Sequence, residues 1–249
     1  MAEARSNLTG MYRYTSIARP VDPAYLTNRA LLIVLPVVGL LSAGMAFLEG
    51  ADSRLLAAAF SGALAAFAAW ALTRELAPDQ DAAAFIALAF AWIASVAFET
   101  HSVLLLFVAL VLARVVNRST GLPLRPFDTL SVLGFCTWAA MSTQQPLILL
   151  VAALAFVFDA TLASPLRRHY LAAAACLLGF AWMLVGDTSL LARDLAVRDW
   201  SMVGVIALGI ALVVGTNPDP VSYCDVSPDR LDRVRVNAGL AVGSLVALQ

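Results

Sequence analysis

Charged residues are scarce in this sequence. Only 13% of its 249 residues are charged, 61% are hydrophobic and the mean hydropathy is +0.84, whereas a soluble domain has about 25% charged and about 45–50% apolar residues. The formal net charge is −1, and no long basic or acidic run is present to attract a nucleic acid. The composition therefore excludes a water-soluble domain and a nucleic-acid-binding protein, and it predicts a membrane protein.

Lysine is absent, and all 16 basic residues are arginine. Together with the abundance of alanine, this bias is typical of GC-rich bacterial genomes, so we expect a bacterial inner-membrane protein. The three cysteines, Cys136, Cys176 and Cys224, lie far apart and form no CxxC or Cys/His pattern. Phosphate-binding loops, Ser/His/Asp elbows and HExxH motifs are also missing. The sequence thus predicts no metal site and no cofactor.

Nine apolar runs are present, each bounded by charged residues or by Pro, Gly or Asn. They are 30–48, 54–73, 82–98, 102–116, 128–142, 146–163, 169–186, 200–215 and 234–249. We predict an all-α polytopic transmembrane bundle of eight or nine helices with short loops, a single domain over 30–249. Because about 20 residues are needed to cross a bilayer, the runs in 82–116 and the run 234–249 need not span it completely.

The arginines are distributed unequally between the two sides of such a bundle. With nine helices, thirteen fall on the side of the N-terminus: Arg5, Arg13, Arg19, Arg29, Arg74, Arg114, Arg118, Arg125, Arg167, Arg168, Arg230, Arg233 and Arg235. The other side has three, Arg54, Arg193 and Arg198. The positive-inside rule therefore places the N-terminus in the cytoplasm. Removing either hairpin, 82–116 or 128–163, leaves this orientation unchanged.

Two segments outside the apolar runs have features of their own. Residues 1–29 form a cytoplasmic or interfacial segment, in which tyrosines alternate with arginines and prolines; it either lies along the lipid headgroups or is a disordered tail. Near the other end of the chain, Ser227 is followed by Pro228 and Asp229. Ser at an N-cap, Pro at the first helical position and an acid in the first turn predict that the last helix begins at Pro228.

Small residues line one face of two of the predicted helices. Gly239 and Gly243 form a GxxxG pair in the last run, and Gly62 and Ala66 lie on an alanine-rich face of the second. Such faces let helices approach closely. They serve either packing within one bundle or association with a second copy or another membrane protein.

Four ionisable residues occupy the first two outer loops, namely Glu49, Asp52, Glu99 and His101. If the first four helices pack side by side, three carboxylates and one imidazole could converge there, a combination able to bind a divalent metal or to perform acid/base chemistry. The alternative is that they are ordinary residues of solvated turns. Only a three-dimensional structure can distinguish the two.

The cytoplasmic side has a second candidate set, formed by Arg114, Arg118, Arg167 and Arg168 together with Asp159. Clustered arginines can hold anionic lipid headgroups or a phosphorylated substrate, although membrane topology alone also explains them. Asp159 lies near the cytoplasmic end of its helix. We expect it to form an interfacial ion pair with Arg167 or Arg168, or else to serve as a transport site.

Three functions follow from these features. The lack of charge at mid-membrane and the small-residue faces favour a non-enzymatic membrane component or accessory subunit, since ion-coupled transporters keep ionisable groups there. A permease for a neutral or amphiphilic small molecule is an alternative, because it needs no buried charge. A membrane-embedded transferase acting on a lipid-linked substrate at the outer face would use the four outer-loop residues.

Overall fold

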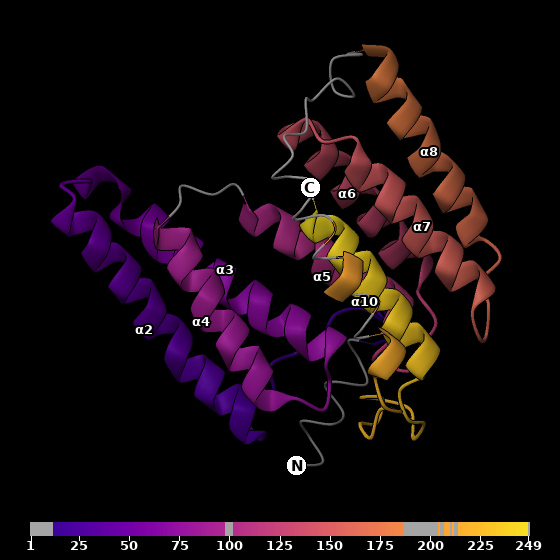
Figure 1. The fold of residues 1–249 in the computed structure, drawn as a ribbon, viewed down its shortest axis with the longest axis horizontal. Coiled ribbons are helices and arrows are strands. Elements are labelled where there is room, and N and C mark those ends of the chain that lie inside the picture. The colour runs from indigo at the N-terminus through magenta and orange to yellow at the C-terminus, as the bar shows by residue number, and fades with distance from the viewer. Residues whose placement is uncertain are drawn as a thin grey trace. The chain divides into compact units, whose positions relative to one another are not determined.

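The computed structural model describes residues 12–97, 102–186, 204, 207–209, 211 and 214–248. These residues are all-helical apart from loops and an isolated β-bridge between Tyr223 and Arg230 (Figure 1). The named helices are α2 (Leu26–Leu48), η1 (Asp52–Arg54), α3 (Leu55–Leu76), α4 (Asp81–Ala97), α5 (Ser102–Asn117), α6 (Pro126–Thr143), α7 (Leu147–Thr161), α8 (His169–Gly186) and α10 (Arg233–Ala247).

The helices coincide closely with the predicted apolar runs. Eight runs correspond to α2 through α8 and α10 with ends that differ by a few residues, which confirms the all-α class. The run 200–215 lies mostly outside the described residues. By length and composition, α2, α3 and α8 are long and apolar enough to cross a membrane, and α4, α5 and α7 are shorter apolar helices.

The chain divides into two compact units. The first unit is Arg19–Leu110, and the second consists of Met1–Ala18 with Val111–Gln249. The boundary falls inside α5, so the two halves of this helix belong to different units.

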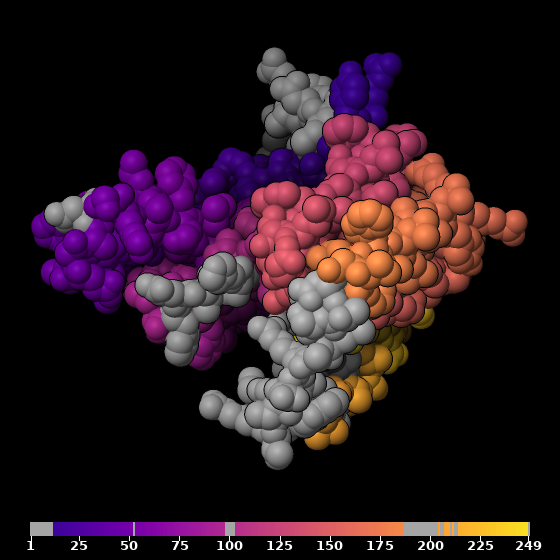
Figure 2. Space-filling view, turned by 90° about the horizontal axis from the view of Figure 1, so that it is seen from above, coloured from indigo at the N-terminus to yellow at the C-terminus, as the bar shows by residue number. Residues whose placement is uncertain are grey.

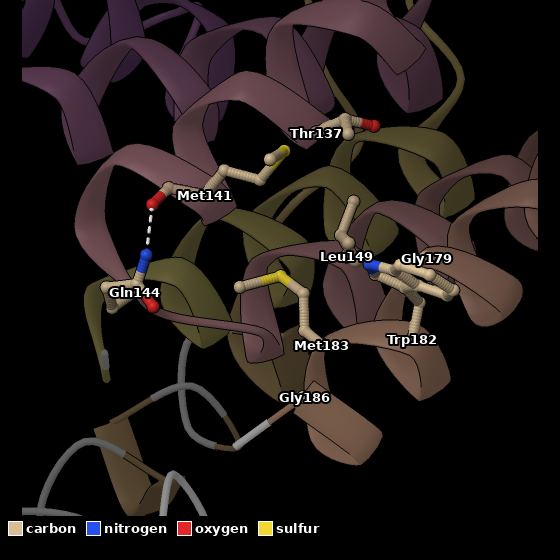
Figure 3. Close-up of a pocket in the computed structure, with 8 residues that line it drawn as sticks. All are labelled: Thr137, Met141, Gln144, Leu149, Gly179, Trp182, Met183 and Gly186. Carbon is tan, nitrogen blue, oxygen red and sulfur yellow. Dashed lines mark hydrogen bonds between the residues drawn. The ribbon is translucent and has the colours of Figure 1, made fainter.

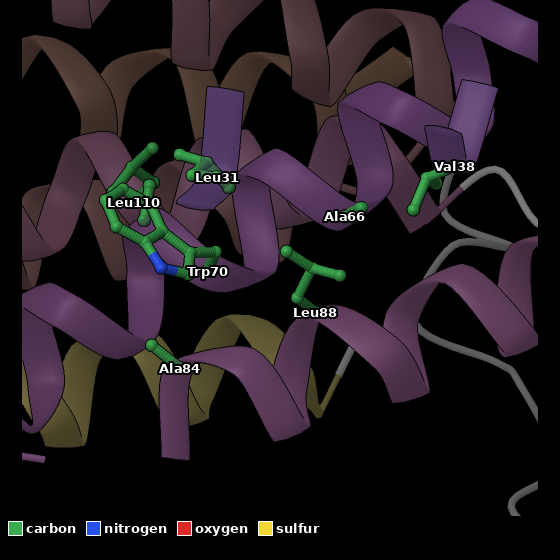
Figure 4. Close-up of a cluster of buried hydrophobic side chains, with 8 residues drawn as sticks. Leu31, Val38, Ala66, Trp70, Ala84, Leu88 and Leu110 are labelled. Atoms are coloured by element: carbon green, nitrogen blue, oxygen red, sulfur yellow. The ribbon is translucent and has the colours of Figure 1, made fainter. Parts of the chain in front are cut away.

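In the first unit, α3 packs against both α2 and α4. Alanine supplies most of the buried surface of α3, and short side chains allow neighbouring helices to approach closely. One buried cluster forms the core of this unit, and it combines alanines with larger side chains (Figure 4). Its members are Leu31, Val38, Ala66, Trp70, Ala71, Ala84, Leu88 and Leu110. Trp70 is the largest of them, and the predicted small-residue face of Ala66 is thus used within the chain.

Gly62 marks a close approach of α2 and α3. A Cβ atom there would overlap Ser42 Oγ and would lie 3.0 Å from Ser42 Cβ. Ser42 is buried, donates to the carbonyl of Val38 at 2.9 Å and accepts from Trp92 Nε1 at 3.0 Å. Glycine at position 62 therefore makes room for a hydroxyl that links α2 to α4.

In the second unit, α7 contacts α6, α8 and α10 (Figure 1). Nine of its residues are buried, including Phe156, Ile148 and Leu149. The space-filling view shows the orange surface of α8 next to the pink and red surface of α6 and α7 (Figure 2). On α10 the absent side chain of Gly239 makes room for Asn117, since a Cβ atom there would overlap Asn117 Oδ1. This half of the GxxxG pair packs within the chain.

The start of the last helix differs from the prediction. α10 begins at Arg233, and its N-cap is Asp232, whose carboxylate accepts from the backbone of Val234 and Arg235. Residues 222–231 instead fold back on themselves. Their backbones pair from Leu231 to Ser222 and from Cys224 to Asp229, and this pairing replaces the helical turn expected from Pro228.

Replacing Gly62 by alanine tests the close approach. Overpacking costs about 1–3 kcal/mol, so we expect Gly62→Ala to lower the free energy of unfolding by this amount, measured by thermal denaturation in detergent. Gly44 is the matched control, because it lies in α2 with nothing within 4 Å of its virtual Cβ. Gly44→Ala should stabilise the chain by about 0.5–1 kcal/mol. Equal effects at the two positions would contradict the packing described.

Candidate functional site

Buried polar side chains gather where several helices of the second unit begin or end. Arg118 directly follows α5, Asp159 lies in the last turn of α7, His169 is the first residue of α8, and Arg235 lies in the first turn of α10. All four side chains are buried, and Asp159 is 0% exposed. We call these four residues the ionic centre.

The carboxylate of Asp159 accepts from two guanidinium groups. Arg118 binds it in a bidentate manner: Nε donates to Oδ1 at 2.6 Å, and Nη2 donates to Oδ2 at 2.7 Å. Arg235 Nη1 donates to Oδ1 at 3.0 Å. Parallel bonds between guanidinium and carboxylate are among the strongest in proteins and fix the orientation of both groups. The ion pairs thus connect the ends of α5, α7 and α10.

The same arginines satisfy backbone carbonyls at the ends of helices. Arg118 Nη1 donates to Ser164 O at 2.9 Å, and Arg235 donates to Val116 O at 2.7 Å and to Ala163 O at 2.5 Å. The last carbonyls of a helix have no partner within the helix and concentrate negative charge. Arg235 therefore caps the C-terminal end of α5 through Val116, and the two guanidinium groups hold the turn after α7 through Ala163 and Ser164 as well as neutralising Asp159.

His169 lies between Asp159 and α6. Its Nδ1 is 2.7 Å from Asp159 Oδ2, and its Nε2 is 2.9 Å from the hydroxyl oxygen of Thr129. The edge of the ring meets Phe156, with 5.2 Å between the ring centres. The imidazole thus attaches the start of α8 to both α6 and α7.

A second buried carboxylate, Asp128, holds the N-terminal segment. Its Oδ2 accepts from the backbone N and the hydroxyl of Ser16, both at 2.8 Å, and from Arg125 N at 3.2 Å. The Ser16 carbonyl accepts from Thr120 Oγ1 at 2.8 Å, and the Ile17 carbonyl accepts from Arg114 at 3.2 Å. These bonds hold Ser16 and Ile17 to α5, α6 and the loop between them within the second unit.

The hydrogen bonds of the ionic centre favour a structural role over a catalytic one. Both oxygens of Asp159 have cationic or imidazole partners, and both guanidinium groups also bond to carbonyls. A general base needs a lone pair directed toward a substrate. The arrangement here directs its lone pairs toward the protein's own arginines, so its chemistry is to hold helices together.

The predicted cytoplasmic residues occupy different places in this arrangement. Arg118 belongs to the ionic centre, whereas Arg167 and Arg168 are exposed. Arg168 donates to the carbonyl of Leu124. The ion pairs of Asp159 are therefore with Arg118 and Arg235 rather than with Arg167 or Arg168, because the turn after α7 points the two adjacent arginines outward.

The outer-loop candidates are only partly described. Glu49 caps the C-terminal end of α2, and Asp52 begins η1. Both belong to the connection between α2 and α3. Glu99 and His101 lie outside the described residues, so the convergence of the four stays a prediction.

Arg235 and His169 were not expected to be partners of Asp159. Arg235 stands between Val234 and Val236 at the start of an apolar helix, and an arginine flanked by apolar residues inside a helix was the available signal. His169 begins the apolar run 169–186 directly after two arginines, and no local pattern marks it as a partner of Asp159. Their common partner is 76 residues from Arg235 in the chain, beyond the reach of a local pattern.

A pocket of about 320 Å³ lies toward the other end of α6, α7 and α8 (Figure 3). Its lining consists of Thr137, Met141, Gln144, Leu149, Gly179, Trp182, Met183 and Gly186. Gln144 turns its amide back to the Met141 carbonyl at 2.7 Å. The lining is mostly apolar, with two thioethers and one indole, and it suits an apolar or amphiphilic molecule.

Comparison with protein-family models, with curated proteins and with solved structures finds no match for this chain. Its function is therefore argued from its own residues.

Substitution of Asp159 tests the ionic centre. Asp159→Asn keeps the shape but leaves two buried guanidinium groups facing a neutral amide, and breaking a buried ion pair in this way costs about 3–5 kcal/mol. We expect a loss of that size in the free energy of unfolding, measured by denaturant titration in detergent. Arg167→Gln, which alters an exposed arginine nearby, should change it by less than about 0.5 kcal/mol. An unchanged stability of Asp159→Asn would show that the ion pairs are dispensable.

Proposed function

We propose that this protein is a multi-pass integral membrane protein of the bacterial inner membrane and serves there as a non-enzymatic component or accessory subunit. The observation that carries the proposal is the reversal of the usual soluble pattern. Large apolar side chains are exposed along the helices, while the charged residues of the ionic centre are buried where helices begin or end.

The exposed apolar side chains are numerous and belong to both units. They include Leu32, Ile33, Leu40, Phe47, Leu56, Phe60, Ile86, Phe90, Ile93, Leu130, Trp138, Met141, Leu171, Leu178, Trp182 and Val185. In water such a surface would aggregate, because soluble monomers expose only small contiguous apolar patches. In a bilayer the same surface faces lipid tails at no cost.

The hydrogen bonds among the loops support the proposed topology. The arginine count assigns residues 12–18, 117–126, 162–169 and 217–232 to one side of the membrane. In the second unit Ser16 bonds to Asp128, Arg118 to Ser164, and the backbone of Asp225 to that of Ser119. Segments joined in this way belong on the same side, which fits a cytoplasmic N-terminus.

The chemistry of the ionic centre supports a non-enzymatic role. Its two arginines hydrogen-bond to its carboxylate and to backbone carbonyls, and its imidazole lies between Asp159 and Thr129. The exposed apolar side chains of the helices are then available for contact with lipid or with neighbouring membrane proteins. A component that acts through such contacts needs no aqueous active site.

The native cysteines allow the topology to be tested directly. Cys224 is half-buried in the loop assigned to the cytoplasm, whereas Cys136 and Cys176 are buried in α6 and α8. A membrane-impermeant maleimide should therefore label the chain in inside-out vesicles, should not label it in right-side-out vesicles, and should fail with Cys224→Ser.

Ser53 provides the matched control for that experiment, because it is exposed in the connection between α2 and α3. In the Cys224→Ser background, Ser53→Cys should be labelled in right-side-out vesicles only. The reverse pattern would overturn the orientation. Labelling of Ser53→Cys in both kinds of vesicle would overturn the membrane-spanning arrangement.

A permease for a neutral or amphiphilic solute is the second candidate, and the pocket between α6, α7 and α8 is the observation in its favour. Osmotic swelling separates the two functions. If the chain is a structural component, proteoliposomes shrunk in glycerol should re-swell no faster than protein-free liposomes. Faster re-swelling that Gly179→Trp abolishes, by filling the pocket, would favour the permease.

A further inference from the structure

Three segments of the second unit meet around the start of α6 and the start of α8. Ser16 bonds to Asp128, Arg168 donates to the carbonyl of Leu124, and Thr129 bonds to His169. These bonds bring residues 12–18, 122–130 and 164–171 together. The three segments therefore lie next to one another in the second unit.

The exposed charge on this surface has a single sign. Arg13, Arg125, Arg167 and Arg168 are exposed, and we call them the arginine surface. The three segments contain one carboxylate, Asp128, which is buried and bonded to Ser16. Four positive charges thus stand on the surface with no exposed acid of the same segments to neutralise them.

Exposed aromatic and aliphatic side chains stand beside these arginines. They are Tyr14 at 70% exposure, Phe127 at 68%, Leu130, Tyr170 and Leu171. Arginine together with Tyr is the combination found where a membrane protein crosses the headgroup region. The positive N-terminal ends of α6 and α8, at Pro126 and His169, add to the potential of the same surface.

We propose that the arginine surface binds the phosphate headgroups of anionic phospholipids. The inference rests on the proposed membrane placement, and it adds a lipid class and a binding surface. Guanidinium groups bind phosphate oxygens in pairs, and the flanking Phe127, Leu130 and Leu171 offer apolar surface that a lipid tail can use and a free phosphate cannot. A spread surface of this kind suits a layer of headgroups better than one small soluble ion.

The other exposed arginines of the second unit differ in their surroundings. Arg233 pairs with Asp219 at 3.6 Å, and Arg230 lies over the ring of Tyr223 in a loop that also has exposed Asp225 and Asp229. Acidic neighbours offset their charge. Replacing Arg230 and Arg233 therefore provides a control that removes two arginines without changing the arginine surface.

The test measures the unfolding temperature of the full chain in a non-ionic detergent with added phosphatidylglycerol or phosphatidylcholine. With phosphatidylglycerol at ten times its dissociation constant we expect a rise of about 3–5 °C, and with phosphatidylcholine none. Arg125→Gln combined with Arg167→Gln should lose at least half of the rise. Arg230→Gln combined with Arg233→Gln should keep it.

Other arms of the experiment identify the source of the phosphate and separate the two proposals. An equal rise with soluble glycerol phosphate, an equal response to phosphatidylcholine, or equal losses in both double variants would overturn the lipid surface. Extraction of native membranes with alkaline carbonate checks the membrane placement by itself. A chain that stays in the pellet but ignores phosphatidylglycerol refutes the lipid surface alone, whereas release into the supernatant refutes the membrane placement.

Discussion

The packing of the second unit depends on the neutralisation of two guanidinium groups by one carboxylate. Asp159 alone would be costly to bury, and so would Arg118 or Arg235. Together they satisfy one another, and the surplus donors of the arginines reach a carbonyl in the last turn of α5 and two carbonyls in the turn after α7. A helix end that would otherwise need water is completed by a side chain of another helix. This allows short apolar helices to end inside the protein.

Among its described residues, the first unit buries one carboxylate, Glu75 in the last turn of α3, which pairs with Arg19 at 2.9 Å. Its helices approach through glycine and alanine, and one buried hydroxyl at Ser42 connects α2 to α4 by way of Trp92. α3 is rich in residues without long side chains, so dispersion contacts account for most of its packing, whereas the second unit brings several charged helix ends together at Asp159.

Local pattern was sufficient to predict most helices, because each apolar run ends at residues that cannot continue it. It could not predict the partners of Asp159, because Arg118 and Arg235 are 41 and 76 residues away in the chain. A hydropathy pattern does not show which helices of a bundle are neighbours. Arg167 and Arg168 were nearer in sequence but point outward. Pro228 was wrong as a helix start because backbone pairing between Ser222 and Leu231 prevailed over the local signal.

The spacing of the ionic centre along the chain has a consequence for biosynthesis. Chains are synthesised from the N-terminus onward, so Arg118 is made before Asp159. The carboxylate of Asp159 can therefore pair with Arg118 as soon as α7 forms. Of the three charged residues, Arg235 is made last, and it then bonds to the last turn of α5 and to the turn after α7. Between these two moments Asp159 already has a partner while Ala163 and Val116 do not. Formation of α10 is thus the step that fixes α5 and α7 relative to each other.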